Sequence, residues 1–492
     1  MKPWGARIRA DSRIPFVYTR CHHHKIRMYF KQFYLSCLSQ ASYFIADEET
    51  RTAVIVDPRR DIDQYLAEAA EHGFVIRHVF LTHFHADFLA GHIELRERTG
   101  ATIHLSARAT AEFEFTPARE GEPLEFGTVR LEFLDTPGHT NEAVSIVIYD
   151  LERDSREPYG ILTGDTLFVG DVGRPDLLAS VGSTASELGG MLYDSLHDKI
   201  LKLPDETLVY PAHGSGSLCG KSLGKENHST IGAQRKQNYA LQPMSREDFI
   251  DLVSADQPTA PPYFLHDAVL NRSEHATLDD VLLRDLNALP LEQVLKMQAV
   301  GAQVLDAREV VEFGAGHLAG SLNIPLTGRF ATWCGFLLNP DHPILLITNA
   351  GQEVEAAVRL GRIGYDFVSG FLEGGAATLA EQDSATLARL SLDDLSSAME
   401  KDSPQVLDVR TVSEWEVDHV EGSVNIPLQE LSNRLDELDS KSSIRIVCKS
   451  SARSAIAASL MLARGFTDVT DVIGGMDAWR TAGKPLVQST TI

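Results

Sequence analysis

The chain has 492 residues, of which 43% are hydrophobic, and a formal net charge of -24. This length predicts about two to four domains with separate cores. Nonspecific binding of nucleic acid depends on basic surface, so the acidic charge argues against it. No stretch approaches the roughly 20 apolar residues that cross a bilayer. We therefore expect neither a nucleic acid nor a membrane as partner.

The chain contains five cysteines, an odd number without close pairing. Disulfides are typical of oxidising compartments, so this usage favours free thiols and a cytoplasmic location. Residues 1–27 carry seven Lys or Arg against one acidic residue and contain no apolar core segment, which argues against a secretory signal. We expect this N-terminal extension to be a disordered tail or to precede the true start at Met28, with a transit peptide as the alternative.

The first domain begins with paired strands, because apolar and polar residues alternate from Phe30 to Asp57. A helix follows, in which Ile62, Tyr65, Leu66 and Ala69 share one face, and Gly73 can cap its C-terminus. The apolar run at residues 75–81 then predicts a buried strand. Further strands are predicted at residues 128–134, 143–148 and 160–162.

Two histidines and a carboxylate, His83, His85 and Asp87, come directly after the buried strand. Imidazole and carboxylate groups are ligands of borderline divalent metals. A histidine pair alone is often structural or merely solvated. Three further polar residues, however, each follow an apolar segment of their own: His139, Asp165 and His213. Four such segments together favour a metal centre.

The order H-x-H-x-D, H, D, H resembles the metallo-β-lactamase superfamily over residues 28–260. The resemblance implies an αββα sandwich, in which two β-sheets pack face to face with helices outside and the metal at one sheet edge. Dinuclear members have a histidine where this chain has Phe88, and a phenyl ring cannot bind a metal. His92 is too far along the chain to replace it.

We therefore expect a single metal, held by His83, His139 and Asp165. Two imidazoles and one carboxylate form the facial triad of non-haem Fe(II) oxygenases, which leaves positions open for substrate and O2. The remaining polar residues of the pattern, His85, Asp87 and His213, would orient these ligands or handle protons.

Residues 170–176 and 211–216 look like the persulfide dioxygenase branch of this superfamily. That resemblance implies one Fe(II) per chain and the oxidation of a low-molecular-weight thiol persulfide by O2 to sulfite and free thiol. Arg174 is expected to hold the anionic part of the substrate, or else to form a structural ion pair. Cys219 is expected near the pocket, where it could take up sulfane sulfur; a buried free thiol is the alternative.

A proline-rich stretch at residues 257–264 marks the first domain boundary, and residues 261–286 are expected to form a linker that straps back along the first domain. Residues 304–326 then recur in closely similar form at residues 406–428. A match over more than twenty residues indicates two copies of one domain. Each copy alternates strands with helices, which predicts a small α/β unit with a mostly parallel sheet.

The repeat resembles the rhodanese sulfurtransferase domain over residues 287–380 and 388–490. In the second copy a strand ends at Cys448 and a helix follows, so backbone N–H groups can stabilise a thiolate or persulfide there. We expect Cys448 to be the nucleophile, with Lys449 and Arg453 attracting an anionic sulfur donor or acceptor such as thiosulfate or sulfite. The C-x4-R spacing favours sulfur transfer over the C-x5-R loop of thiol phosphatases.

The first copy has no cysteine in its equivalent loop at residues 347–353, and Glu353 adds negative charge there. Cys334 comes too early to replace the missing thiol. We expect this copy to be inactive and to act as a spacer, a docking surface or a contact in a homodimer or homotetramer.

Two other functions remain open. The first is a glyoxalase II-like hydrolase that cleaves a thioester with metal-bound hydroxide, although Phe88 argues against the dinuclear centre of such enzymes. The second is a non-catalytic persulfide sensor or sulfur carrier with a structural metal. No motif specifies the thiol carrier, so glutathione and coenzyme A are equally open.

Overall fold

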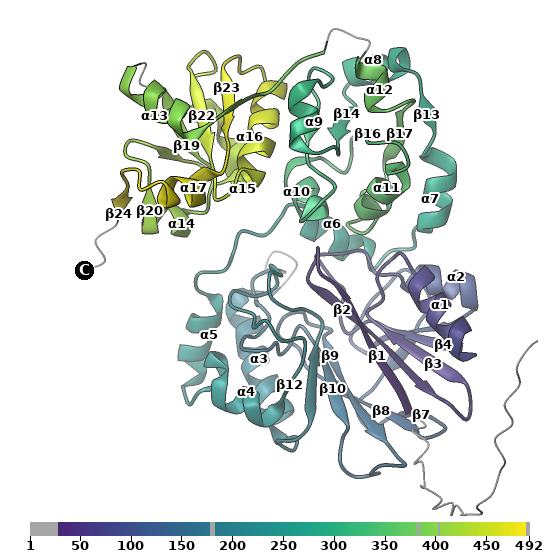
Figure 1. The fold of residues 1–492 in the computed structure, drawn as a ribbon. Coiled ribbons are helices and arrows are strands. Elements are labelled where there is room, and N and C mark those ends of the chain that lie inside the picture. The colour runs from purple at the N-terminus through teal and green to yellow at the C-terminus, as the bar shows by residue number, and fades with distance from the viewer. Residues whose placement is uncertain (1–27, 178–182, 381–383, 402–403, 489–492) are drawn as a thin grey trace, which may run out of the picture.

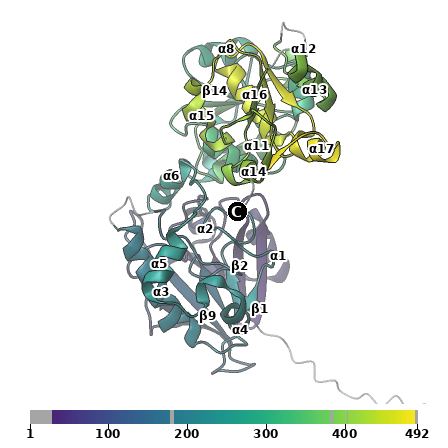
Figure 2. The same ribbon diagram turned by 90° about the vertical axis from the view of Figure 1, so that its left-hand side faces the viewer.

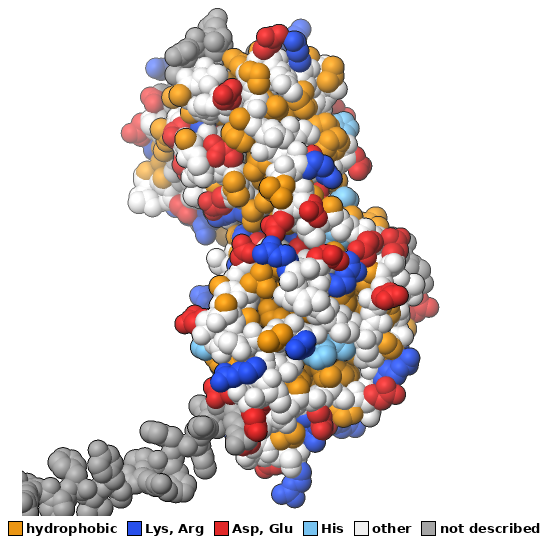
Figure 3. Space-filling model, turned by 90° about the vertical axis from the view of Figure 1, so that its right-hand side faces the viewer, with side chains coloured by type: hydrophobic (Ala, Val, Ile, Leu, Met, Phe, Trp, Pro, Cys, Tyr) orange, Lys and Arg blue, Asp and Glu red, His pale blue; other side chains and the backbone are white. Residues whose placement is uncertain are grey.

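The computed structural model describes residues 28–177, 183–380, 384–401 and 404–488. The expectations for residues 1–27 lie outside this part of the chain. Figure 1 shows one lobe built on two large sheets and, above it, two smaller α/β units next to each other. Figure 2 shows the same two lobes from the side. Figure 3 shows one side of the molecule, on which acidic and basic side chains lie interspersed around the junction of the lobes.

The first lobe contains two six-stranded sheets, and the order of strands in each sheet follows the chain. The first sheet comprises β1 (Met28–Leu35), β2 (Gln40–Asp47), β3 (Thr52–Val56), β4 (Val75–Phe80), β5 (Thr102–Ser106) and β6 (Thr116–Ala118). The second comprises β7 (Leu124–Phe126), β8 (Val129–Asp135), β9 (Val144–Asp150), β10 (Gly160–Gly164), β11 (Leu208–Pro211) and β12 (Ser229–Thr230).

Five helices cover the outer faces of these sheets. They are α1 (Asp63–His72), α2 (His92–Thr99), α3 (Ala185–Asp198), α4 (Ile231–Gln237) and α5 (Arg246–Ser254). One buried cluster lies between the sheets and includes Ile45 and Val56 from the first sheet and Leu131 and Ile146 from the second. The predicted αββα sandwich is therefore confirmed, including the helix that ends at the left-handed Gly73.

The segment 261–286, expected as a linker, folds into two helices: α6 (Tyr263–Leu270) and α7 (Leu278–Asp285). Asn271, directly after α6, donates from its amide nitrogen to the carbonyls of His85 and Phe88 at 2.8 and 2.9 Å. Its amide oxygen accepts from the backbone N–H of Ala90. These bonds tie the segment to the predicted metal loop.

The upper lobe contains two five-stranded sheets whose strands all run parallel. The first copy comprises β13 (Ala288–Leu289), α8 (Leu291–Ala299), β14 (Gln303–Asp306), α9 (Val310–Ala315), β15 (Leu322–Asn323), α10 (Phe330–Leu337), β16 (Ile344–Ile347), α11 (Glu353–Gly361), β17 (Val368–Leu372) and α12 (Ala376–Ala380). The second comprises β18 (Ala388–Leu390), α13 (Leu392–Lys401), β19 (Gln405–Asp408), α14 (Val412–Val417), β21 (Val424–Asn425), α15 (Leu428–Arg434), β22 (Ile444–Val447), α16 (Ala452–Ala463), β23 (Val469–Val472) and α17 (Gly475–Thr481), beside a small ribbon of β20 (Asp418–His419) and β24 (Val487–Gln488).

The described helices include none that is both long and apolar enough to cross a bilayer.

Arg60, only 1% exposed, joins the first lobe to the first rhodanese-like copy. Its guanidinium pairs with Glu94 at 2.8 Å and with both carboxylate oxygens of Asp366. It also donates to the carbonyls of Ala276 and Gly361 at 2.7 and 3.2 Å. One buried cation thus holds together three segments that are distant in sequence.

Replacing this cation by a methionine, in Arg60→Met, is expected to lower the free energy of unfolding by about 3 kcal/mol, because Glu94 is left buried without its partner. Thermal denaturation followed by circular dichroism measures the effect. The control is Arg98→Met, since Arg98 and its partner Asp279 are both largely exposed, and its effect should stay within about 0.5 kcal/mol. Equal midpoints for the two variants would show that the buried pair does not stabilise the junction.

Candidate functional site

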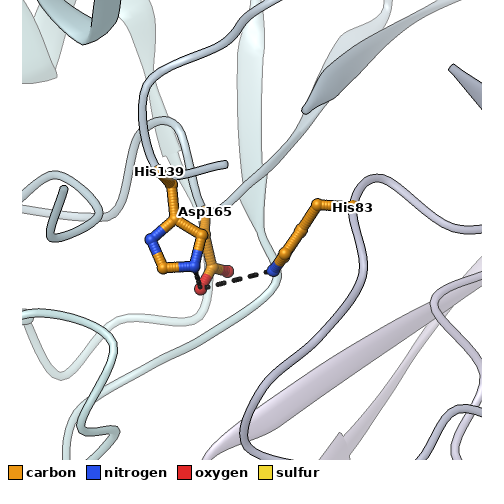
Figure 4. A group of neighbouring side chains, drawn as sticks. All are labelled: His83, His139 and Asp165. Carbon is orange, nitrogen blue, oxygen red and sulfur yellow. Dashed lines mark ion pairs between the residues drawn. The ribbon is translucent and has the colours of Figure 1, made fainter. Parts of the chain in front are cut away.

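Three strand ends of the first lobe bring His83, His139 and Asp165 together (Figure 4). His83 follows β4, His139 follows β8, and Asp165 directly follows β10. The Nε2 atoms of His83 and His139 lie 3.8 and 3.4 Å from Asp165 Oδ2. All three residues are buried, so the protein shields the group from solvent.

Gly164 allows these strand ends to approach one another. Its φ of +51° lies in the left-handed region that favours glycine, and a Cβ there would lie 2.7 Å from Thr82 Oγ1. Thr82 precedes His83, so a side chain at position 164 would push the loop of His83 away from Asp165.

The second ring nitrogen of each histidine is held by a protein acceptor. His139 Nδ1 lies 2.9 Å from the Arg174 carbonyl, and His213 Nδ1 lies 3.2 Å from the Ser39 carbonyl, so both ring nitrogens donate. The Thr82 hydroxyl donates to Asp57 at 2.8 Å and can accept from His83 Nδ1 at 3.1 Å. Each Nε2 therefore carries the lone pair and points into the group, the arrangement found around bound metals.

Asp165 is 2% exposed, and neither of its carboxylate oxygens has a hydrogen-bond partner in the described part of the chain. A buried carboxylate without compensation is costly. Burial lowers the pKa of His83 well below its usual value, and the neighbouring histidines lower it further, so this imidazole is neutral. Two imidazole Nε2 atoms beside a buried carboxylate without a hydrogen-bond partner fit a divalent cation.

The residues predicted to orient the ligands form a second group, His85, Asp87 and His213, which could itself hold a metal ion. His213 Nε2 lies 3.4 Å from Asp87 and 3.5 Å from Asp165, so the two groups adjoin. Phe88 supplies no ligand; its ring packs against that of His85 at 4.3 Å. A second potential metal site therefore remains, although Phe88 stands where dinuclear members have a histidine. One metal per chain stays a prediction.

Asp57 contacts the candidate site, although its sequence position indicated only the end of a predicted strand. Its Oδ1 accepts from the Thr82 backbone N–H at 2.7 Å and lies 3.0 Å from His85 Nε2. Burial opposes protonation of His85, but the charge and hydrogen bond of Asp57 together with the charges of Asp87 and Asp165 outweigh it and raise the pKa of this imidazole. The available signal was the carboxylate directly after an apolar strand, the same signal that identified Asp165.

Arg174 lies close to the group, but its donors are taken up by the protein. It makes a bidentate pair with Asp176 at 2.7 and 2.6 Å and donates to the Pro258 carbonyl at 2.5 Å. Its side chain is buried, whereas its backbone carbonyl orients His139. These contacts favour the structural ion pair over direct binding of a substrate anion.

Cys219 lies beside the site, in a group with Asp165 and His213. It is 1% exposed, and burial raises the pKa of its thiol well above the usual value, with the negative charges of Asp87 and Asp165 adding to the effect. The expected position near the pocket is thus observed, and the group is a neutral thiol in this environment.

The second candidate site is the loop between β22 and α16, where Cys448 is buried. The backbone N–H of Ser451 donates to its Sγ at 3.1 Å, and Ser451 adopts a φ of +78° to turn the loop around the sulfur. Ser454 Oγ lies 3.3 Å from Sγ and donates to Asp471 at 2.6 Å. The loop therefore encloses the sulfur as predicted for a sulfur-transfer cysteine.

Of the two predicted cationic residues of this loop, Lys449 is exposed and Arg453 is paired with Glu414 at 2.6 and 2.8 Å. The pair was missed, since Glu414 lies 39 residues earlier. Although burial opposes ionisation of Glu414, the hydrogen bonds and charge of Arg453 lower its pKa from 4.5 to about 2. Arg453 is thus held at the loop with part of its charge compensated.

In the first copy Thr348 takes the place of the nucleophile, because strand pairing aligns Ile347 with Val447. Its buried hydroxyl has no hydrogen-bond partner in the described part of the chain. Gly351 has a φ of +86°, like Ser451 in the second copy, so the loop shape persists without the cysteine. Cys334 lies buried in α10, away from this loop, and its pKa is raised by burial.

Comparison with known proteins gives matches to both halves of the chain. A metallo-beta-lactamase superfamily model matches residues 35–213, and a rhodanese-like domain model matches residues 290–381 and 391–482. The crystal structure of a metallo-beta-lactamase from Staphylococcus aureus superposes with a TM-score of 0.63 at 32% identity, and covers 70% of this chain and 98% of that one.

Relatives of two kinds illustrate the matches to the first lobe. The mitochondrial persulfide dioxygenase ETHE1 of Homo sapiens is 31% identical over 213 residues, which are 43% of this chain and 75% of that protein. A hydroxyacylglutathione hydrolase of a Polaromonas species is 33% identical over 175 residues, which are 35% of this chain and 61% of that protein.

Removing the uncompensated carboxylate, in Asp165→Ala, is expected to abolish metal retention and, in the metal-free protein, to raise the free energy of unfolding by about 1 to 3 kcal/mol. Metal content after gel filtration and thermal midpoints in the presence of a chelator measure the two effects. The control is Asp251→Ala, which removes an exposed carboxylate on α5, outside the site. A metal-free Asp165→Ala protein less stable than metal-free wild type would contradict this account.

The ion pair of Glu414 with Arg453 predicts a pH dependence of stability. Because the folded pKa of Glu414 is about 2 and its ordinary value is 4.5, the stabilisation is complete above about pH 5 and is lost as the pH falls toward 2. The difference in urea midpoint between wild type and Glu414→Gln should therefore shrink over this interval. A constant difference from pH 6 to pH 2.5 would show that the pair does not set this pKa.

Proposed function

Because the chain belongs to the metallo-β-lactamase superfamily as a relative of the persulfide dioxygenases, and also carries two rhodanese-like domains, we propose that it is an Fe(II)-dependent persulfide dioxygenase coupled to a sulfurtransferase. The overall reaction would be RSSH + O2 + H2O → RSH + SO3²⁻ + 2 H⁺. The outer sulfur loses four electrons and O2 gains them, so no other oxidant is needed. The observation that carries the proposal is the triad of His83, His139 and Asp165 in one chain with the Cys448 loop.

His83, His139 and Asp165 would hold the iron, which supplies the one-electron chemistry that lets O2 react with a persulfide. The protein contributes fixed orientation, since the Nδ1 atoms of these histidines are already bonded to Thr82 and to the Arg174 carbonyl. His85 and Asp87 are suited to hold and release protons, because burial raises the pKa of Asp87 while Asp57 raises that of His85.

At the second site the Cys448 thiolate would attack thiosulfate or a persulfide at its sulfane sulfur. With thiosulfate the step is Cys–S⁻ + S2O3²⁻ → Cys–S–S⁻ + SO3²⁻, in which the S–S bond of thiosulfate breaks and sulfite leaves. The N–H of Ser451 would stabilise the charge on the sulfur, and Lys449 and Arg453 would attract the anionic donor. The reverse step would consume sulfite that the dioxygenase releases.

A second candidate function is the hydrolysis of a thioester. The second group of potential ligands, His85, Asp87 and His213, favours it, as does the similarity to a hydroxyacylglutathione hydrolase. Two metals could generate a hydroxide without O2. The two functions differ in metal count and in oxygen demand.

The test is oxygen uptake by the full chain with a defined persulfide after reconstitution with Fe(II). His139→Ala should reduce uptake at least about 100-fold, because one ligand of the triad is lost. Cys448→Ser should keep oxygen uptake and lose sulfur transfer from thiosulfate, whereas Cys334→Ser, a buried thiol in the first copy, should keep both. Two zinc ions per chain with oxygen-independent thioester cleavage would instead support the hydrolase.

A further inference from the structure

Ser454 lies between the candidate nucleophile Cys448 and a buried carboxylate. It belongs to the first turn of α16, which packs beside β22 and β23 (Figure 1). Its Oγ is 3.3 Å from Cys448 Sγ and 2.6 Å from Asp471 Oδ1. All three residues are at most 1% exposed. The three side chains therefore form a continuous series of contacts that the protein shields from solvent.

The direction of these hydrogen bonds follows from the single proton of the Ser454 hydroxyl. A distance of 2.6 Å is typical of an O–H group that donates to a carboxylate, so this proton points to Asp471. The lone pairs of Oγ are then free to face Sγ at 3.3 Å, where they can accept from the thiol S–H. The geometry thus orders the thiol, the hydroxyl and the carboxylate as successive donors and acceptors, from Cys448 to Asp471.

Asp471 is held in place from the neighbouring strand. Arg389 on β18 donates from Nε to its Oδ2 at 2.9 Å, so the two carboxylate oxygens have separate partners. Burial raises the pKa of Asp471, although the bonds from Ser454 and Arg389 oppose this shift. A carboxylate with a raised pKa accepts a proton more readily than one exposed to water. Asp471 is therefore a proton acceptor with a fixed orientation.

The other charged groups around Cys448 are paired or exposed. Arg453 on α16, whose charge interacts with Cys448, pairs with Glu414 of α14. Lys449 in the loop is exposed. The charged groups of the neighbouring elements form two further pairs, Asp408 with Arg410 and Asp477 with Arg480. Among the described residues, Ser454 alone connects Sγ to a carboxylate through hydrogen bonds.

The first copy, which lacks the nucleophile, also lacks the proton acceptor. The pairing of strands places Phe371 at the position of Asp471, and Ala288 at the position of Arg389. An ion pair that served only to join two strands would be equally useful in both copies. The polar side chains occur instead in the copy that carries the thiol, which favours a role in the chemistry of Cys448.

We propose that Ser454 and Asp471 form a proton relay for Cys448, an inference that rests on the proposed sulfur transfer and adds how the thiol loses its proton. As Sγ bonds to a sulfane sulfur, the S–H bond breaks and its proton passes to Ser454 Oγ, whose own proton passes to Asp471 Oδ1. With thiosulfate as donor, sulfite leaves with the electron pair of the broken S–S bond.

The relay is reversed in the second half of the transfer. When the persulfide passes its outer sulfur to an acceptor anion, Cys448 is released as a thiolate and takes the proton back from Asp471 through Ser454. Ser454 contacts the reacting sulfur and is a catalytic residue of this step. Asp471 acts through Ser454 and is a positioning residue.

Alkylation of Cys448 by iodoacetamide tests the relay without sulfur transfer, because the deprotonated sulfur is the nucleophile. The rate is followed in the full chain by mass spectrometry of the peptide that contains Cys448. At about pH 6.5, Ser454→Ala and Asp471→Asn should each react about tenfold more slowly than wild type, or slower still. At about pH 9.5, above the ordinary pKa of a cysteine, hydroxide removes the proton and all rates should agree within about threefold. The control, Asp477→Asn, removes an exposed carboxylate of the same copy and should react as wild type does at both pH values.

The double variant Ser454→Ala, Asp471→Asn separates a relay from a structural role. Because both groups move the same proton, the double variant should react no more slowly than the slower single variant. Losses that multiply, an equal loss at both pH values, or no loss at about pH 6.5 would each overturn the relay.

Thermal midpoints from circular dichroism show that each variant is folded before its rate is compared. If Asp471→Asn unfolds because Arg389 loses its partner, Ser454→Ala alone carries the comparison of the two pH values. The expected alkylation rates in a protein that transfers no sulfur from thiosulfate would support the relay and reject the sulfurtransferase. The failure of one proposal is therefore distinguishable from the failure of the other.

Discussion

The first lobe is organised around one buried negative charge that the described side chains do not neutralise. Asp165 ends β10 with both carboxylate oxygens lacking hydrogen-bond partners, and His83, His139 and His213 each direct Nε2 toward it. A folded chain keeps such an arrangement at a cost in stability. Hydrogen bonds to Thr82, Arg174 and Ser39 fix the orientation of the imidazole rings. Packing elsewhere in the lobe offsets the loss of stability, and the Nε2 atoms are oriented to bind a cation.

This constraint explains several features away from the site. The close approach of β10 to Thr82 requires glycine at position 164. The Arg174 side chain is held by Asp176 and by the chain near Pro258, which keeps its carbonyl aimed at His139. Asn271 holds the loop of His85 from the opposite direction. The helices after residue 261 are therefore part of the support of the site as well as a connection between lobes.

Sequence reasoning placed the main residues of both sites, because each follows an apolar strand and strand ends of one sheet meet at one edge. His83, Asp165 and Cys448 were all found by that signal. Residues that hold the two candidate sites through long-range contacts were not found: Asn271 and Glu414 stand in segments with no local signature of these contacts. Their partners are fixed only when separate elements pack.

The second potential metal group shows a different limit of the sequence. Replacement of a ligand histidine by Phe88 correctly removes one donor, yet the ring of Phe88 packs on His85 and leaves Asp87 and His213 in reach of each other. A sequence pattern shows which ligand residues are absent, but it does not predict the distances between the ligand residues that remain.

The two rhodanese-like copies differ in the loop where such a domain carries its nucleophile. The second keeps a buried cysteine and an N–H aimed at its sulfur. The first keeps the loop shape through Gly351 but has Thr348 in place of the nucleophile, and a thiol cannot be replaced by a hydroxyl in sulfur transfer. The first copy instead contributes a contact with the first lobe, since its Asp366 pairs with the buried Arg60. The backbone N–H of Asn323 also donates to Ser459 of the second copy at 2.9 Å, so the first copy connects the first lobe to the second copy.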